Sequence, residues 1–231
     1  MFVLGGMQGV LGWYMVKSGL VNVPHVSQYR LTAHFGLAVL IYGYIFWVAL
    51  GLFFKANASA PKAREAQAQL LRFSRLIGGL IFITLLSGGF VAGLKAGFAY
   101  NTFPLMNGQV IPDGLLQIDP AWKNIFENVT TVQFDHRVLA TLLFLIIPTF
   151  WWRSRQVELV PGARLSTHLL LGALALQLTL GISTLLLHVP IPLASAHQGG
   201  SLLLLTASLL VTYQLGANLR DEAITTNPGE T

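Results

Sequence analysis

Six long apolar runs constrain this chain more than any other feature of its sequence. Each run has about 20 residues, the length that a helix needs to cross the hydrocarbon core of a bilayer. Only 10% of the residues are charged, whereas a water-soluble domain carries about a quarter. The sequence therefore predicts an all-α integral membrane protein with six transmembrane helices. The runs cover roughly residues 1–17, 31–54, 74–94, 136–152, 166–187 and 195–216.

The basic residues are concentrated in one set of connections between the runs. The segment 55–75 carries five Lys and Arg residues and the segment 151–165 carries three, whereas 18–30, 95–135 and 188–194 carry fewer for their length. By the positive-inside rule, the first set faces the cytoplasm, or the matrix in a mitochondrion. Both termini then lie inside, and we expect 95–135 to lie against the outer membrane face as a partly ordered cap.

Charge and cysteine content exclude several classes of partner and site. The net charge is +5, but the fourteen basic residues lie mainly between the runs and at their ends, so no nucleic-acid partner is expected. The absence of cysteine excludes disulfides, iron–sulfur clusters, thiolate ligation of haem and Cys-based zinc sites. Met1 is followed directly by apolar sequence without a basic segment, so no cleavable targeting peptide is predicted.

Two short stretches of the chain resemble each other. Gln8–Gly12 reads Q-G-V-L-G and Gln177–Gly181 reads Q-L-T-L-G. A short connection with a Val-Pro pair follows each stretch, and the next run then begins with a histidine near its start, His34 or His197. A duplicated helical bundle explains this pattern, as internal repeats are common in membrane proteins. A full duplication of four-helix units would place two further spans before residue 1.

Three histidines share one position relative to the membrane. His34, His136 and His197 each lie near the outer end of a run that passes from outside to inside. A single histidine at this depth is more often a tolerated polar residue, but three at one depth favour a shared role. Paired neutral imidazoles ligate haem iron between the helices of a bundle. We expect His136 and His197 to cooperate, because both lie in the half of the repeat that looks complete.

Three basic residues near the same outer boundary are candidate partners for the carboxylates of a haem. They are Arg30, Lys95 and Arg137, and arginine pairs with carboxylates in a bidentate manner. The alternative is that each side chain extends to the membrane interface without binding anything. No role is assigned to the remaining histidines, His25, His168 and His188.

Long strings in the sequence resemble haem A synthases of the mitochondrial and alphaproteobacterial type. The likeness runs in order from about residue 5 to residue 215. The matching strings are GMQGVLGWYMVKSGL at 6–20, QYRL at 28–31, VAGLKAG at 91–97, YNTFPLM at 100–106, FEN at 126–128, QFDHR at 133–137 and AHQ at 196–198.

The resemblance implies a fold, a reaction and a set of ligands. Members of the family have eight helices in two pseudo-symmetric four-helix bundles, and they oxidise the C8 methyl of haem O to the formyl of haem A. It implies that His136 and His197 ligate haem b and that His34 is a ligand on the side of the substrate haem. The implied partners are haem O, haem O synthase, the cytochrome oxidase assembly pathway and an unidentified electron donor. The implied location is a multi-pass position in the inner membrane, for which a bacterial cell is favoured over a mitochondrion.

The sequence departs from this family pattern at its beginning. The family's second helix carries a Glu three residues before a His-Arg pair, whereas this chain shows only the second-half counterpart, with Gln133 in place of the Glu. We therefore identify no catalytic residue here and expect that residue, with two helices, before Met1. The expected domains are a remnant of the substrate-haem bundle at 1–55, a loop at 56–75, the haem b bundle at 76–218 and a polar tail at 219–231.

Two other functions stay open at this point. A bis-histidine b-type haem protein could transfer electrons without modifying haem, and it would share the same ligands. A transporter would need polar residues near mid-membrane, and the runs contain few of them. We also expect that the 231-residue chain alone leaves haem O unconverted, and a homo-oligomer is left open.

Overall fold

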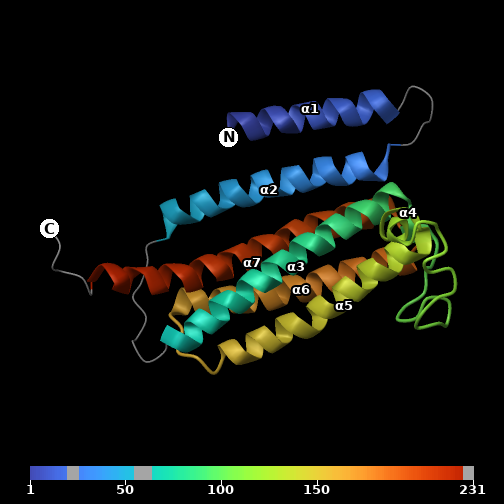
Figure 1. Cartoon of the computed structure of the whole chain (residues 1–231). Coiled ribbons are helices and arrows are strands. Elements are labelled where there is room, and N and C mark those ends of the chain that lie inside the picture. Colours follow the sequence, from blue (N-terminus) through green and yellow to red (C-terminus); the bar gives the residue numbers. More distant parts are fainter. Residues whose placement is uncertain (20–25, 55–63, 226–231) are drawn as a thin grey trace. The chain divides into compact units, whose positions relative to one another are not determined.

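The computed structural model describes residues 1–19, 26–54 and 64–225, and every regular element in these ranges is a helix (Figure 1). Five helices are long and apolar enough to cross a membrane, which confirms the prediction of an all-α membrane protein. The sixth expected span forms a helix of 18 residues, α1, but it is not among those five. The long helices are α1 (Phe2–Gly19), α2 (Gln28–Phe53), α3 (Arg64–Gly93), α5 (Val129–Ser154), α6 (Pro161–Leu186) and α7 (Ile191–Thr225).

Two helices begin well before the apolar runs that predicted them. Helix α3 begins at Arg64, because its first ten residues are mostly Ala, Gln, Leu and Arg, which favour helix despite their polarity. Helix α5 begins at Val129, where the side-chain oxygen of Asn128 accepts a hydrogen bond from the Thr131 amide at 2.9 Å. This contact is an N-cap, which fixes the start of a helix. His136 therefore lies about two turns inside α5.

The end of the chain also differs from the sequence prediction. Helix α7 continues to Thr225, so the first part of the expected polar tail is helical. Residues 226–231 lie outside the described part of the chain. Helix α6 has Pro161 as its first residue, where a missing N–H costs nothing because the first turn leaves its amides unpaired.

The chain divides into two compact units, each of which takes segments from several helices. The first unit contains all three predicted ligands and the long connection, whereas the expected domains followed chain order. The expected domain boundaries remain a prediction. The first unit comprises Met1–Tyr42, Phe82–Thr141 and Leu178–Gly199, and the second comprises Gly43–Ile81, Leu142–Gln177 and Gly200–Thr231.

Polar contacts between helices stabilise the second unit. Thr212 of α7 donates to the Ser74 hydroxyl of α3 at 3.1 Å, and the buried Gln67 donates to the Leu215 carbonyl at 3.0 Å. Hydrogen bonds and small residues bring helices together in membranes, where lipid removes most of the hydrophobic drive for association. These contacts belong to the second unit and include none of the predicted ligands, so we attribute a packing role to them.

The long connection between α3 and α5 is ordered mainly by asparagine side chains. It contains the short helices η2 (Ala96–Phe98), η3 (Ala121–Lys123) and α4 (Asn124–Glu127). The buried Asn124 accepts from the Ile118 amide at 2.9 Å and donates to the Ile118 carbonyl at 2.7 Å. Asn128 donates to the Gly114 carbonyl at 3.0 Å. The connection is thus held in one shape beside the predicted ligands, while its position outside the membrane remains a prediction.

Candidate functional site

All three predicted histidine ligands lie in the first unit, and each imidazole contacts a glycine of another helix. His34 lies on α2, His136 on α5 and His197 on α7. The missing side chain of each glycine leaves the space that the ring occupies. The three pairs are Gly12 with His34, Gly88 with His136 and Gly181 with His197.

At two of these contacts a Cβ on the glycine would crowd the ring. A Cβ atom on Gly181 would lie 2.7 Å from Cε1 of His197, and one on Gly12 would lie 3.0 Å from Cε1 of His34. The corresponding distance at Gly88 is 3.4 Å from Cε1 of His136, which is an ordinary van der Waals contact. The rings of His34 and His197 are therefore placed by the absence of a side chain on the facing helix.

The two closest contacts coincide with the repeat in the sequence. Gly12 ends the first of the two similar stretches and Gly181 ends the second. Neither glycine was predicted from the sequence to lie beside a histidine. No atom lies within 4 Å of a Cβ on Gly199, so it holds no ring. The spacing Q-x-x-x-G before a His-bearing helix is the signal that could have identified Gly12 and Gly181.

The structure brings His136 and His197 together. The two imidazoles interact electrostatically within the first unit. Nδ1 of His136 lies 2.7 Å from the hydroxyl of Ser87 on α3, a residue that the sequence analysis missed. The expected cooperation of these two histidines as ligands stays a prediction.

His34 has a different polar neighbour. The amide nitrogen of Gln8 on α1 lies 3.4 Å from Nε2 of His34 and donates to the His34 carbonyl at 3.1 Å. Nδ1 of His34 is buried and has no hydrogen-bond partner among the described residues. The first glutamine of the repeat thus contacts the histidine of the following helix.

Arg137 contacts the long connection. Its guanidinium donates to the carbonyl oxygens of Thr102 at 2.9 Å and Tyr100 at 2.8 Å. Gln133, one turn earlier on α5, donates to the same Tyr100 carbonyl at 3.0 Å. Both side chains therefore attach the connection to the helix that carries His136. The expected contact of Arg137 with a haem carboxylate stays a prediction.

The other two predicted basic residues lie at helix ends of the first unit. The Arg30 guanidinium lies 4.8 Å from the centre of the Tyr14 ring, a cation–π contact between α2 and α1. Lys95 is exposed and has a left-handed backbone with φ of 55° after the end of α3. Neither geometry tests a role in binding carboxylates, so that role also stays a prediction.

The histidines without an assigned role lie elsewhere. Nδ1 of His168 accepts a hydrogen bond from the Trp151 indole at 2.8 Å, in the second unit. His188 has a φ of 61° in the turn between α6 and α7. His25 lies outside the described residues.

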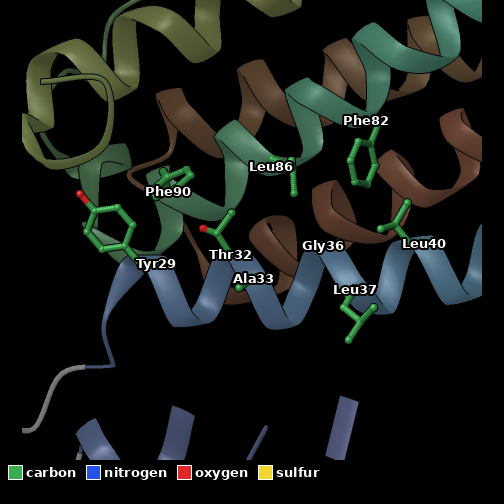
Figure 2. A pocket seen from close by; sticks show the side chains of 9 residues that line it. All are labelled: Tyr29, Thr32, Ala33, Gly36, Leu37, Leu40, Phe82, Leu86 and Phe90. Atoms are coloured by element: carbon green, nitrogen blue, oxygen red, sulfur yellow. The ribbon is translucent and has the colours of Figure 1, made fainter. Parts of the chain in front are cut away.

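Two apolar grooves flank α3 within the first unit. One, with a volume of about 420 Å³, lies between α2 and α3, and Figure 2 shows Leu86 of α3 directed toward Gly36 of α2. The other, of about 410 Å³, is bordered by α3, α4 and α5 and includes Ser87 and Asp135. Asp135 is an acid inside a candidate span that the sequence analysis missed. Both grooves include Leu86 and Phe90, so α3 presents aromatic and aliphatic side chains on two sides.

The residues present fit a haem better than a compact metal site. Among the residues that the structure describes, no three His, Cys, Asp or Glu side chains form a group able to hold a metal ion. Two histidines that interact across helices are the donor set of a six-coordinate haem, which needs one nitrogen on each face. Glycines at both rings leave the helix surfaces beside them flat.

The sequence matches a family and several relatives. The family described as cytochrome oxidase assembly protein matches residues 1–209. A protein named heme A synthase from Nitrosospira multiformis is 57% identical over 214 residues, which are 93% of this chain and 60% of that protein. Heme A synthase of Nitrosomonas eutropha is 51% identical over the same shares. Heme A synthase COX15 of Mus musculus is 45% identical over 90% of this chain and 51% of its own length. The chain thus spans half to three fifths of the length of these relatives.

Proposed function

The chain belongs to the family of cytochrome oxidase assembly proteins, and from this premise we propose that it acts in the synthesis of haem A. The proposed reaction oxidises the C8 methyl of haem O to a formyl group, so the chain works as an oxidoreductase. The observation that carries the proposal is the interacting pair His136 and His197, with glycine contacts at both rings.

Each histidine has a proposed role. His136 and His197 hold haem b, one from α5 and the other from α7, and His34 of α2 is a ligand on the side of the substrate haem. A bound haem b would supply one-electron transfer. Gly12 and Gly181 leave the space in which the imidazoles of His34 and His197 lie.

The remaining assignments concern surroundings and partners. Arg30, Lys95 and Arg137 contribute positive charge near the proposed haem carboxylates, while Arg137 also holds the connection at Tyr100. The protein lies in the inner membrane and takes haem O from a haem O synthase. An electron donor and the cytochrome oxidase assembly pathway complete its proposed partners.

The test is a haem conversion assay. A host without its own haem A synthase would express a haem O synthase together with one of two proteins. The first is the 231-residue chain. The second is a chimaera in which this chain replaces the matching part of the Nitrosospira multiformis relative. Extracted haems are separated by chromatography.

We expect haem A from the chimaera and none after His136→Ala in it, because the electron path then lacks its haem ligand. For the chain alone, the sequence-based expectation is that haem O stays unconverted. A chimaera that retains haem b but accumulates only haem O would contradict the proposal, and it would favour the electron-transfer protein without haem-modifying activity.

A further inference from the structure

We propose that Ser87 is a positioning residue for His136. Its hydroxyl oxygen accepts a hydrogen bond from Nδ1–H of the imidazole, which leaves the lone pair of Nε2 free to bind iron. This inference rests on the proposed function, in which His136 is a ligand of haem b.

The directions of the hydrogen bonds follow from the groups around Ser87. Its Oγ atom lies 2.8 Å from the Thr84 carbonyl oxygen, which can only accept, so the hydroxyl proton points to that carbonyl. Oγ also lies 2.7 Å from Nδ1 of His136, and toward this atom it offers only a lone pair. The proton between them must therefore belong to the imidazole.

A proton on Nδ1 leaves the other ring nitrogen of His136 for a ligand. The Thr84 carbonyl also makes a backbone hydrogen bond with His136. Two oxygen atoms thus lie next to the ring, and the one at Nδ1 is the Ser87 hydroxyl. In a neutral imidazole with a proton on Nδ1, Nε2 is the unprotonated nitrogen and the metal ligand. Such a partner on the far nitrogen both orients a ligating histidine and raises its basicity.

Ser87 and the next residue act on one ring from the same helix. Gly88 contacts Cε1 of His136, with 3.4 Å from a Cβ on the glycine to that carbon. The serine holds one nitrogen and the glycine lies against the neighbouring carbon. Consecutive residues of α3 therefore define where the ring of α5 lies.

Another serine of α3, Ser74, serves as a control for the hydrogen bond that Ser87 makes within its own helix. Ser74 donates to the Leu71 carbonyl at 2.9 Å, the same bond to the residue three positions earlier that Ser87 makes. Ser74 then accepts from Thr212 and not from a histidine. Ser74→Ala is thus a matched control, because it removes a similar bond in the same helix.

The experiment uses the full chain purified with haem and compares Ser87→Ala, Ser87→Thr, Ser74→Ala and His136→Ala. The readouts are haem affinity, reduction potential and the low-spin electron paramagnetic resonance spectrum. Ser87→Ala should weaken haem affinity about tenfold, the lower end for such partners. The reduction potential should rise, since an imidazole without this acceptor donates less charge to iron.

The control variants should behave differently. Ser87→Thr should resemble the unmodified protein, because it keeps the hydroxyl and its methyl has room in the groove of about 410 Å³ that Ser87 borders. Ser74→Ala should leave the potential and the spectrum unchanged. If Ser87→Ala does not fold, Ser87→Cys, with its weaker acceptor, should shift the potential in the same direction by a smaller amount.

Two results would overturn the inference, and they are distinguishable. If His136→Ala loses its haem while Ser87→Ala or Ser87→Cys keeps an unchanged potential and spectrum, the role of Ser87 is wrong and the haem ligand stands. If His136→Ala retains an unchanged haem spectrum, the proposed ligand is wrong and the role of Ser87 falls with it.

Discussion

His34 and His136 are the same side chain held in opposite ways. At His136 the neighbour Ser87 lies at Nδ1, and Nε2 is left for a ligand. At His34 the amide of Gln8 lies 3.4 Å from Nε2, while Nδ1 is buried without a hydrogen-bond partner in the described part of the chain. In the proposed function, the first ring holds a permanent cofactor and the second holds a substrate that must leave. The difference suits these roles, because Gln8 has to turn away before iron binds His34 and can return when haem departs.

The packing of the imidazole rings groups the histidines differently from their polar neighbours. His34 and His197 each contact the last glycine of a similar stretch, Gly12 or Gly181, at distances at which an added Cβ would crowd the ring. His136 contacts Gly88 less closely. The repeat therefore preserved how a ring is packed, while the polar neighbour differs from one histidine to another.

The comparison fails altogether if the histidines do not lie on one side of the membrane. Reporter fusions in the loops 55–75 and 95–135 should give all-or-none opposite signals, the first inside and the second outside, because five basic residues lie in the first. Each loop is fused in turn to a reporter that is active only in the periplasm and to one that is active only in the cytoplasm, and the ratio of the two activities gives its side. Two fusions on the same side would rule out the predicted topology and the shared depth.

Removal of a ligand should have the next largest effect. His136→Ala and His197→Ala should each abolish bound low-spin haem in the purified protein, because one imidazole cannot make the six-coordinate centre. His34→Ala should keep haem b, since it lies on the substrate side. The reduced optical spectrum and a haem assay measure the bound haem of each variant. If His34→Ala abolished the haem spectrum while His136→Ala and His197→Ala kept it, the proposed assignment would be reversed.

Added volume at the glycines should have a smaller effect. Gly181→Ala should destabilise the protein by about 1–3 kcal/mol, the usual cost of overpacking, because its Cβ meets the His197 ring at 2.7 Å. Gly12→Ala should cost less, with 3.0 Å to the His34 ring.

Thermal unfolding in detergent measures these changes. Gly172→Ala and Gly9→Ala are controls on the same two helices, since no atom lies within 4 Å of a Cβ on either. Equal stability of Gly181→Ala and Gly172→Ala would show that the ring moves aside at no cost.

The smallest effect is expected at Gln8. Gln8→Met keeps a similar volume but cannot donate to the His34 carbonyl, so it should lose about 0.6 kcal/mol, the average for a hydrogen bond between membrane helices. Haem binding at His34 should not weaken, because the amide that faces Nε2 of His34 is gone. Haem titration by absorbance measures this, and weaker binding would mean that Gln8 supports the ligand and does not compete with it.

Much of the fold followed from the lengths of the apolar runs, because a bilayer sets how long a helix must be. The polar first turns of α3 were missed, since Arg64 and its neighbours form helix without being apolar. The start of α5 was missed because Asn128 acts through one side-chain bond that hydropathy does not register.

The candidate site was predictable only in its histidines. Their expected depth follows from their place in each run, which is local information. Ser87 lies 49 residues from His136 in the chain, and which helix faces which is set by packing that a single sequence does not show. Gly12 and Gly181 were accessible in principle through the repeat, because their spacing from Gln8 and Gln177 is the same.

The contact at Gly181 has a consequence for genetics. Scales of residue similarity rank glycine to alanine among the mildest exchanges, yet here the first added carbon is the one that meets the imidazole at 2.7 Å. Every missense change of a glycine codon adds that carbon, because glycine alone lacks it. All missense changes at this codon should therefore share the contact with the His197 ring, whatever the new residue is.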